Sequence, residues 1–367
     1  MEQDVYLLLE DGTFFQGKGF GATASKMVGE VVFTTSMVGY LETLSDPSYY
    51  GQIIVQTFPM IGNYGVIFSD FESSQLWPKA YIVREWCQYP SNFRSEGNLD
   101  AFFRAHNIQG MYGIDTRALT RIIREHGAMN GMLTTKAPPY SNEEFDILKK
   151  YHIQNAVEQV SRVVKESFPV SSPHRHIVLW DFGTKQNIIR ELNQRGCTVT
   201  AVPARSSADE ILSLSPDGIM LSNGPGDPAE NLEIISQLQE LCKAKIPIFG
   251  ICLGHQLLAL SQGGKTEKLK YGHRGANQPV KDTRTGRVYI TSQNHGYAVK
   301  GESLPNFAEV RFLNLNDGTC EGIDYKNMPA FSVQFHPEAC SGPLDTEFLF
   351  DRFMKLMDDW YTQPKNL

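Results

Sequence analysis

Ile246-Pro-Ile-Phe-Gly-Ile-Cys-Leu-Gly-His-Gln256 is the stretch that decides the fold. An apolar run leads into Cys252, which lies between Gly250 and Gly254, and the leucines that follow have helical spacing. The order of strand, sharp turn and helix is that of an elbow that exposes a nucleophile above a sheet, and glycines let the backbone fold back there. Free N–H groups and the dipole at a helix N-terminus stabilise a thiolate. Cys252 is therefore a candidate nucleophile, and the alternative is a small buried hydrophobic residue.

The composition limits the classes of function. With 367 residues the chain is long enough for two domains, and 41% apolar with 20% charged residues is ordinary for a globular protein. The net charge of −7 offers no basic surface to nucleic acid or anionic lipid. The N-terminal residues lack the features of a signal peptide, and no apolar run is long enough to span a bilayer. We therefore expect a cytoplasmic protein with no nucleic-acid or membrane partner.

The cysteines are far apart in the sequence and contain no Cys-x-x-Cys pair. This spacing argues against a zinc cluster and against a disulfide framework. We expect reduced thiols and no metal site at the six positions, which are Cys87, Cys197, Cys242, Cys252, Cys320 and Cys340.

The first half of the chain is predicted to be β-rich. Strand candidates lie at residues 5–9, 14–15, 31–35 and 53–57, with a polar loop at 36–50 that is either functional or a plain connection. A helix is predicted after residue 114, with Asp115 or Thr116 as its cap and Gly127 just past its end. One of its faces carries three arginines. That face is either a basic strip for docking a partner or an ordinary solvated surface, and the arginines are Arg117, Arg121 and Arg124.

The second half of the chain alternates strands and helices. Strands that are apolar throughout are expected at 177–180, 198–202, 218–221 and 246–250, with helices at 185–195, 208–214 and 232–243 between them. The predicted fold class is α/β: a β-rich N-terminal domain and a C-terminal α/β domain with a mostly parallel sheet. A helical segment at 141–165 precedes a linker rich in proline and serine. We place the domains at 1–165 and 176–362 and the linker at 166–175.

Two further strand ends carry chemical signals. The loop Ser222-Asn-Gly-Pro-Gly-Asp-Pro228 follows a strand and has N–H groups suited to an anion, although a plain turn is the alternative. His336 and Glu338 follow a strand at 330–335, where an imidazole can act as base toward a thiol and a carboxylate can orient it; a surface turn is again the alternative. Gly264-Lys-Thr266 is not a phosphate loop because it follows a helix, and Gly17-Lys-Gly-Phe-Gly21 is interpreted as a turn.

Together these segments resemble the class I (triad) glutamine amidotransferases. The three that carry this resemblance are Gly250-Ile-Cys-Leu-Gly-His-Gln256, Asn223-Gly-Pro-Gly-Asp-Pro228 and His336-Pro-Glu338. Other motifs are similar to those of the small, glutamine-hydrolysing subunits of carbamoyl phosphate synthases, and the resemblance covers nearly the whole chain. These motifs are Gly29-Glu-Val-Val-Phe33, Thr35-Ser-Met37, Gly39-Tyr40, Asp46-Pro-Ser-Tyr49, Gly113-Ile-Asp-Thr-Arg117 and Gln293-Asn-His-Gly296.

The resemblance implies a role for each matching residue. Cys252 attacks the side-chain amide of glutamine, His336 accepts and then donates the proton, and Glu338 holds His336. The backbone N–H groups of Leu253 and of the 224–226 loop meet the oxyanion. Tyr297 stands where some relatives have phenylalanine. The residues implied to bind L-glutamine are Ser48, Gly224, Gly226, Leu253, Gln256, Asn294, Gly296 and Tyr297.

The resemblance also implies a partner. Ammonia passes through a tunnel to a large synthetase subunit, which binds ATP, bicarbonate and a divalent metal, so no cofactor is expected in this chain. The assembly is a heterodimer or a higher-order form, and its product serves arginine or pyrimidine synthesis. With this partner, the arginines of the helix after residue 114 become a more plausible docking surface.

Two other functions are compatible with parts of the sequence. A stand-alone cysteine hydrolase of γ-glutamyl compounds explains the three catalytic residues but leaves the β-rich first half unused. A non-catalytic regulatory subunit explains the two domains but not the intact set of nucleophile, base and carboxylate. Amidotransferase subunits for anthranilate, GMP or CTP synthesis share the second domain and lack this first domain.

Overall fold

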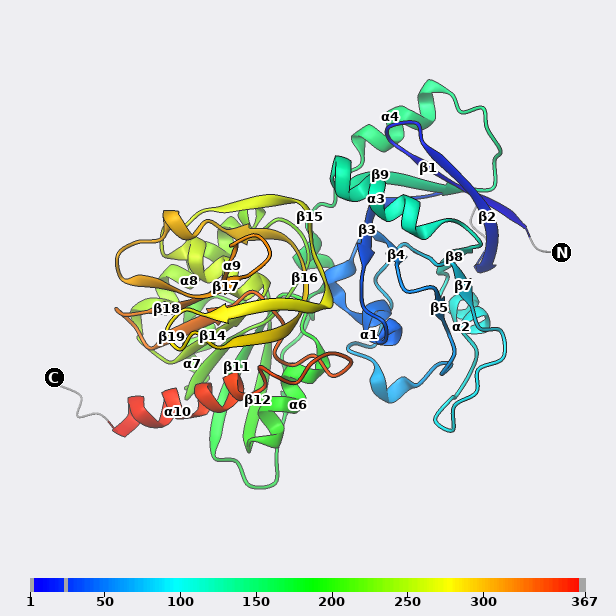
Figure 1. The fold of residues 1–367 in the computed structure, drawn as a ribbon. Coiled ribbons are helices and arrows are strands. Elements are labelled where there is room, and N and C mark those ends of the chain that lie inside the picture. The colour runs from blue at the N-terminus through cyan, green and yellow to red at the C-terminus, as the bar shows by residue number, and fades with distance from the viewer. Residues whose placement is uncertain (1–2, 23–25, 363–367) are drawn as a thin grey trace. The chain divides into compact units, whose positions relative to one another are not determined.

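A computed structural model describes residues 3–22 and 26–362 of the chain and divides into two compact units (Figure 1). The N-terminal unit is Met1–Gln154 with Lys270–Arg274, and the C-terminal unit is Asn155–Leu269 with Gly275–Leu367. The division therefore falls before the predicted linker at 166–175. Among the described residues, no helix has both the length and the apolar character needed to cross a membrane.

The N-terminal unit is built on a closed barrel with the strand order β1-β2-β8-β6-β4-β3-β9. Antiparallel pairing of β1 with β9, in which Leu7 faces Leu133, closes the barrel, whereas β3, β4, β6 and β8 run parallel. Its strands are β1 (Asp4–Leu9), β2 (Phe14–Gly21), β3 (Lys26–Thr34), β4 (Gln52–Gln56), β6 (Ala80–Ile82), β8 (Gln109–Tyr112) and β9 (Met129–Thr134). The predicted strands at 5–9, 31–35 and 53–57 correspond to β1, β3 and β4.

Both faces of β4 are buried. Ile53 and Val55 of β4 pack into one apolar cluster, and Ile54 between them packs into a second cluster. This alternation follows from the period of two along a strand. The remaining elements of the unit are α1 (Tyr40–Ser45), η1 (Pro47–Tyr49), β5 (Met60–Ile61), η2 (Phe68–Asp70), β7 (Glu85–Trp86), α2 (Leu99–Ala105), α3 (Thr116–His126) and α4 (Asn142–Lys150).

The predicted helix after residue 114 is α3. Its cap is Asp115, whose side chain accepts a hydrogen bond from the N–H of Ala118 at 2.9 Å, and it ends at Gly127, which has a φ of 102°. The three arginines of α3 are exposed. Exposure is common to a docking surface and a solvated face, so the two interpretations of this helix remain.

Three predictions for the first half were wrong. Residues 17–21 are not a turn but part of β2, where a Cβ on Gly17 would lie 2.5 Å from the carbonyl oxygen of Tyr112. The glycine therefore permits close strand approach and does not mark a chain reversal. The loop at 36–50 contains α1 and η1, and the helix predicted at 141–165 breaks after α4.

The C-terminal unit contains a sheet of ten strands in the order β10-β12-β11-β13-β14-β19-β18-β16-β15-β17. It is mixed and not mostly parallel as predicted. The five strands from β12 to β19 in this order run parallel, and antiparallel pairings extend the sheet on both sides. The parallel strands are β11 (Arg175–Asp181), β12 (Cys197–Pro203), β13 (Gly218–Leu221), β14 (Ile248–Ile251) and β19 (Ala330–Val333).

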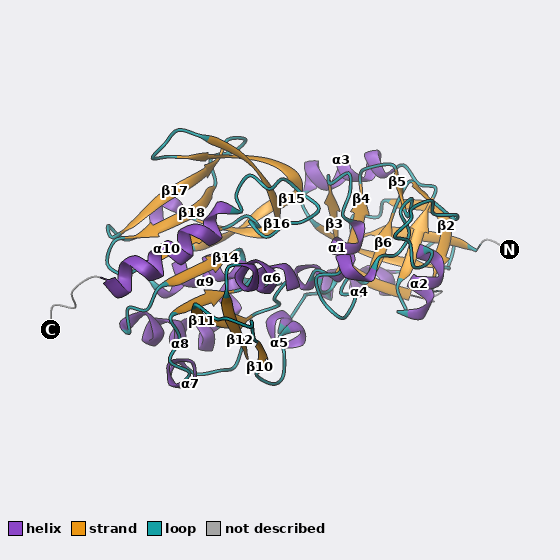
Figure 2. Ribbon diagram, turned by 90° about the horizontal axis from the view of Figure 1, so that it is seen from below, coloured by secondary structure: helices purple, strands orange, loops and turns teal. Residues whose placement is uncertain are grey.

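Helices cover both faces of the parallel strands (Figure 2). Along β11, Val178 and Trp180 pack into a cluster with α7, α8 and α9, whereas Ile177 and Leu179 pack with α6 and α10. Burial on both faces explains why these strands are apolar throughout. The helices are α5 (Ala156–Val160), α6 (Gln186–Gln194), α7 (Ala208–Ser213), α8 (Leu232–Lys243), α9 (Leu253–Ser261) and α10 (Phe348–Thr362).

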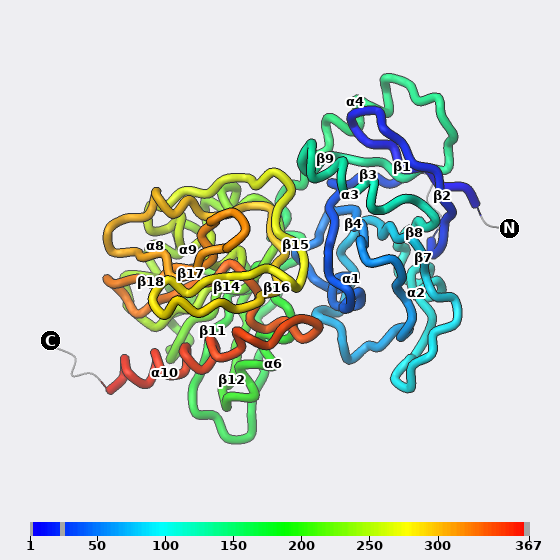
Figure 3. Tube along the Cα trace, in the orientation of Figure 1, coloured from blue at the N-terminus to red at the C-terminus, as the bar shows by residue number. Residues whose placement is uncertain are grey.

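The antiparallel part of the sheet was not predicted. In Figure 3 the chain can be followed from β15 (Thr266–Asp282) through β16 (Val288–Val299) to β17 (Ala308–Asn314) and β18 (Cys320–Tyr325). The predicted linker is also partly wrong, because β10 (Glu166–Phe168) pairs with β12 as an edge strand. Nearby prolines and serines indicated a linker. A short edge strand tolerates them, because its outer side forms no hydrogen bonds with another strand.

Candidate active site

Cys252 lies between β14 and α9 on a strained turn. Its φ of 52° and ψ of −103° are uncommon for a residue other than glycine, and its N–H donates to the carbonyl of Val333 at 2.8 Å. Such strain is typical of the elbow that holds a nucleophile between a strand and a helix. Leu253 is the first residue of α9, so its N–H has no carbonyl partner within the helix.

The neighbouring glycines permit close backbone approach, as expected for the elbow. A Cβ on Gly254 would lie 2.4 Å from the carbonyl oxygen of Leu221, and one on Gly250 would lie 2.9 Å from the carbonyl oxygen of Gly254. A Cβ on Gly224 would lie 2.3 Å from the carbonyl oxygen of Phe182. Any larger residue at these positions would force the backbone to move.

His336 and Glu338 follow β19 and form a buried pair. Nδ1 of His336 lies 2.7 Å from Oε1 of Glu338, and both side chains are almost fully buried. Nε2 of His336 makes no hydrogen bond within the described residues. Since Nδ1 faces a carboxylate, Nε2 is the nitrogen through which the imidazole can exchange a proton with another group.

Lys185 is the third charged group of this cluster. Its Nζ lies 3.2 Å from Oε1 of Glu338. Burial raises the pKa of Glu338, but Lys185 and His336 lower it by more, to about 2. Burial and Lys185 lower the pKa of His336, whereas Glu338 and the sulfur of Cys252 raise it by more in sum, to about 9.

The loop after β11 positions Lys185. Oδ1 of Asp181 accepts hydrogen bonds from the N–H groups of Gly183 and Thr184, and the N–H of Lys185 donates to Oδ1 of Asn223 at 3.1 Å. The sequence predicted Lys185 only as the start of a helix. Its place at the carboxyl end of an apolar parallel strand was the signal that could have identified it.

Two groups besides His336 contact or face the sulfur of Cys252. Sγ lies 3.8 Å from the backbone oxygen of Asn294 on β16, and Nε2 of Gln334 lies 3.6 Å from Sγ. Gln334 lies between β19 and His336, and no role for it was predicted from the sequence. His255, three residues after the nucleophile, bonds to Ser332 through Nδ1 at 2.8 Å, and burial lowers its pKa to about 3. It is therefore neutral.

Contacts link several of the residues implied to bind glutamine. Nε2 of Gln256 donates to the backbone oxygen of Tyr297 at 2.8 Å, and Asn294 and Gly296 lie on the same strand, β16. A side-chain atom of Leu253 lies 2.7 Å from the position of a Cβ on Gly224, so these two residues adjoin.

Two further residues are implied to bind glutamine. Gly226 lines a cavity of about 700 Å³ with Pro225 and Asp227. Ser48 belongs to the N-terminal unit, where the side chain of Asp46 accepts a hydrogen bond from its N–H at 2.9 Å.

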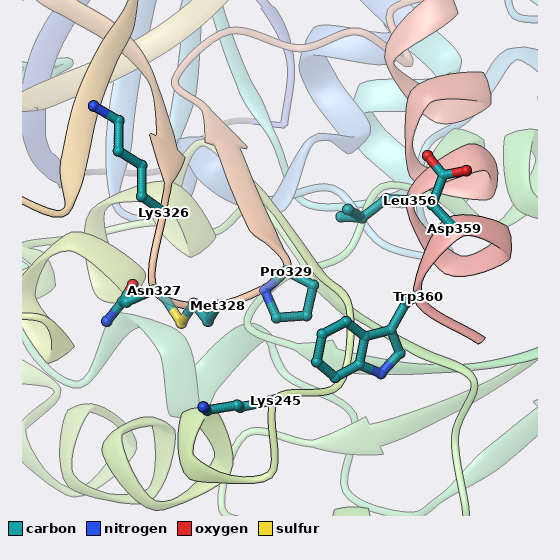
Figure 4. A pocket seen from close by; sticks show the side chains of 8 residues that line it. All are labelled: Lys245, Lys326, Asn327, Met328, Pro329, Leu356, Asp359 and Trp360. Atoms are coloured by element: carbon teal, nitrogen blue, oxygen red, sulfur yellow. The ribbon is translucent and has the colours of Figure 1, made fainter. Parts of the chain in front are cut away.

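A cavity of about 310 Å³ lies at the opposite ends of the strands that lead to Cys252 and His336 (Figure 4). Its lining includes Lys245, which precedes β14, Pro329, which precedes β19, and Trp360 of α10. Ligands of parallel sheets bind at the carboxyl ends of the strands. We therefore assign the candidate active site to the Cys252 end and not to this cavity.

Comparisons with known proteins cover both halves of the chain. The family model for the carbamoyl-phosphate synthase small chain, CPSase domain, matches residues 7–133, and the model for glutamine amidotransferase class-I matches residues 178–356. The carbamoyl phosphate synthase small chain of Symbiobacterium thermophilum is 48% identical over 357 residues, which cover 95% of this chain and 98% of that protein. The small chain of Clostridium perfringens is 50% identical over 349 residues, with the same coverage of 95% and 98%. That of Bacillus thuringiensis subsp. konkukian is 50% identical over 364 residues and covers 98% of each chain.

Proposed function

Because the chain belongs to the carbamoyl phosphate synthase small chain family, it is the glutamine-hydrolysing subunit of that enzyme, and we propose that Cys252, His336 and Glu338 carry out the hydrolysis. The observation that carries this proposal is the 2.7 Å contact of His336 with Glu338 in a cluster where the strained Cys252 raises the pKa of the imidazole. A stand-alone hydrolase would leave residues 7–133, which match the small-chain model, without a role.

The proposed reaction has two halves. Sγ of Cys252 forms a bond to the amide carbon of glutamine, its proton moves to Nε2 of His336, and the carbonyl electron pair moves to oxygen. When that intermediate collapses, the C–N bond breaks and His336 returns the proton to the leaving nitrogen, which departs as ammonia. Water then attacks the γ-glutamyl thioester with His336 as base, and the C–S bond breaks to release glutamate and restore the thiol.

Two backbone N–H groups are proposed to bind the oxyanion. Leu253 supplies an N–H from the first turn of α9, and the 224–226 loop supplies a second. Contacts of Asn294 and Gln256 near the sulfur support their proposed roles in glutamine binding. The same role for Gly296, Tyr297 and Gly226 rests on the resemblance, as it does for Ser48.

A small chain implies a large subunit as partner. We propose that this subunit receives the ammonia and binds the ATP and divalent metal needed for carbamoyl phosphate synthesis, and that this chain holds no cofactor of its own. A cytoplasmic location is part of the proposal. This location is supported by five free thiols, because such thiols are typical of a reducing compartment. They are Cys87, Cys197, Cys242, Cys252 and Cys320.

The test is glutamate release from glutamine by the full chain, with and without the large subunit, for the parent and for Cys252→Ser. We expect release that the partner stimulates and that Cys252→Ser abolishes. Cys87→Ser is the matched control, because Cys87 lies in the N-terminal unit and should leave release unchanged. Undiminished release by Cys252→Ser would refute the assignment of the nucleophile.

A further inference from the structure

The side chain of Gln334 contacts the sulfur of Cys252 in the interior of the C-terminal unit. Its Nε2 lies 3.6 Å from Sγ, and the residue is fully buried, with 0% of its surface exposed. Its backbone N–H donates to the carbonyl of Glu321 at 2.9 Å, which holds the main chain in place. The amide is therefore a fixed part of the surroundings of the nucleophile.

The orientation of this amide follows from its neighbours. The backbone oxygen of Tyr297 can only accept a hydrogen bond, so the atom of Gln256 that lies 2.8 Å from it is the nitrogen. The same nitrogen lies 2.9 Å from the amide of Gln334, and the atom that it meets there must be the oxygen. The nitrogen of Gln334 therefore faces the sulfur, and no flip of either amide satisfies all three contacts.

The two contacts of the sulfur favour different protonation states. The backbone oxygen of Asn294, at 3.8 Å, accepts a hydrogen bond from the neutral thiol and repels a thiolate. An N–H from Gln334 acts in the opposite sense, because a hydrogen bond to a charged acceptor is about twice as strong as one to a neutral acceptor. Once the thiol proton has moved to His336, the N–H of Gln334 faces the charge that remains on Sγ.

We propose that Gln334 is a further catalytic residue, whose amide N–H stabilises the thiolate of Cys252 and holds its sulfur for attack on glutamine. The inference rests on the proposed function of Cys252 as nucleophile. Gln256 has a second role under this proposal, since it orients Gln334 as well as lying next to the substrate site.

The test measures the reactivity of the sulfur directly. The full-length chain is treated with iodoacetamide over a range of pH, and modification of the peptide that contains Cys252 is followed by mass spectrometry, with the exposed Cys340 as internal reference. Gln334→Glu keeps the size and the oxygen that Gln256 contacts but replaces the N–H donor. We expect alkylation of Cys252 at neutral pH to slow by roughly tenfold or more and its pH profile to move to higher pH. The kcat for glutamine hydrolysis should fall by a similar factor, with KM changed less.

The controls separate loss of the donor from general loosening. Gln334→Met removes the donor without burying a charge, so it gives the same test if Gln334→Glu does not fold, and thermal unfolding reports the folded state of each variant. The control variant is Ser332→Ala. Ser332 lies on β19 with similar burial and contacts His255, so its loss should lower stability without moving the alkylation profile.

Three outcomes overturn the inference: unchanged alkylation in both Gln334 variants, unchanged kcat, or an equal effect of Ser332→Ala. Failure of the proposed function is distinct, because it would show as glutamate release by Cys252→Ser whatever the alkylation rates are.

Discussion

Gly254→Ala tests whether the turn at Cys252 requires glycine. The added Cβ would lie 2.4 Å from the carbonyl oxygen of Leu221 and 2.7 Å from its Cβ, and neither atom can swing away as the end of a flexible side chain does. Overpacking of this kind costs about 1–3 kcal/mol. In a domain of about 150–250 residues this cost lowers Tm by about 2–12 °C.

The same substitution should reduce catalysis. Gly254 follows Leu253, whose N–H is the proposed oxyanion donor, and its own N–H donates to the carbonyl of Ser222 at 3.0 Å. A shift of this turn misplaces the donor, and loss of one such donor costs about 10²–10³ in kcat. We therefore expect kcat for glutamine hydrolysis to fall at least tenfold, and by at most the roughly 10²–10³ expected for complete loss of this donor.

Scanning fluorimetry and glutamate release measure the two effects. Gly97→Ala is the control, because a Cβ there meets nothing within 4 Å, so its Tm should change little. A Gly254→Ala chain with the parental Tm and kcat would show that the turn accepts a side chain and that the close approach to Leu221 does not limit it.

Three further predictions concern charge and packing in the C-terminal unit. Lys185→Met removes a cation that lowers the pKa of Glu338. The ionised Glu338 contributes stability to the folded state above its usual pKa of 4.5, and this contribution is lost as the pH falls toward about 2; in the variant we expect the loss to begin at higher pH. Removal of one partner of a buried pair also costs about 3–5 kcal/mol, and Tm measured against acid pH checks both effects. Because the pKa of His336 is raised, its charged form stabilises the folded state fully below the usual pKa of 6.5, and this stability is lost as the pH rises through about 9. Cys252→Ala removes a group that raises this pKa, so the loss should move to lower pH in Tm measurements at alkaline pH. Phe353→Ala empties a fully buried position of α10 against β14 and should cost about 3–5 kcal/mol in denaturant unfolding, and a cost below about 1 kcal/mol would contradict the packing.

The parallel half of the C-terminal sheet could be predicted because its signals are local. Each of its central strands is apolar over a short run and ends at a helix or a polar loop, and the glycines around Cys252 mark the turn within five residues. The ends of β14 and β19 then bring Cys252 and His336 to one edge of the sheet, although the two residues are 84 positions apart in the sequence. No contact had to be known in advance for this inference.

The remaining features depend on contacts between distant residues. Closure of the barrel needs β1 to pair with β9, more than a hundred residues away, and β6 is only three residues long. Lys185 and Gln334 belong to the site through partners far along the chain, so neither stands out by composition. Gly17 shows a different cause, since a glycine that permits close strand approach has the same local signal as one in a turn.

Closure of the N-terminal barrel also limits how another protein can recognise this unit. A sheet with an open edge offers unpaired N–H and C=O groups, and a foreign strand can join it with little regard to side chains. The pairing of β1 with β9 removes that option for the seven barrel strands. A partner must instead recognise loops, helices and outward side chains. Specificity for that partner can therefore change one side chain at a time while the barrel backbone stays the same.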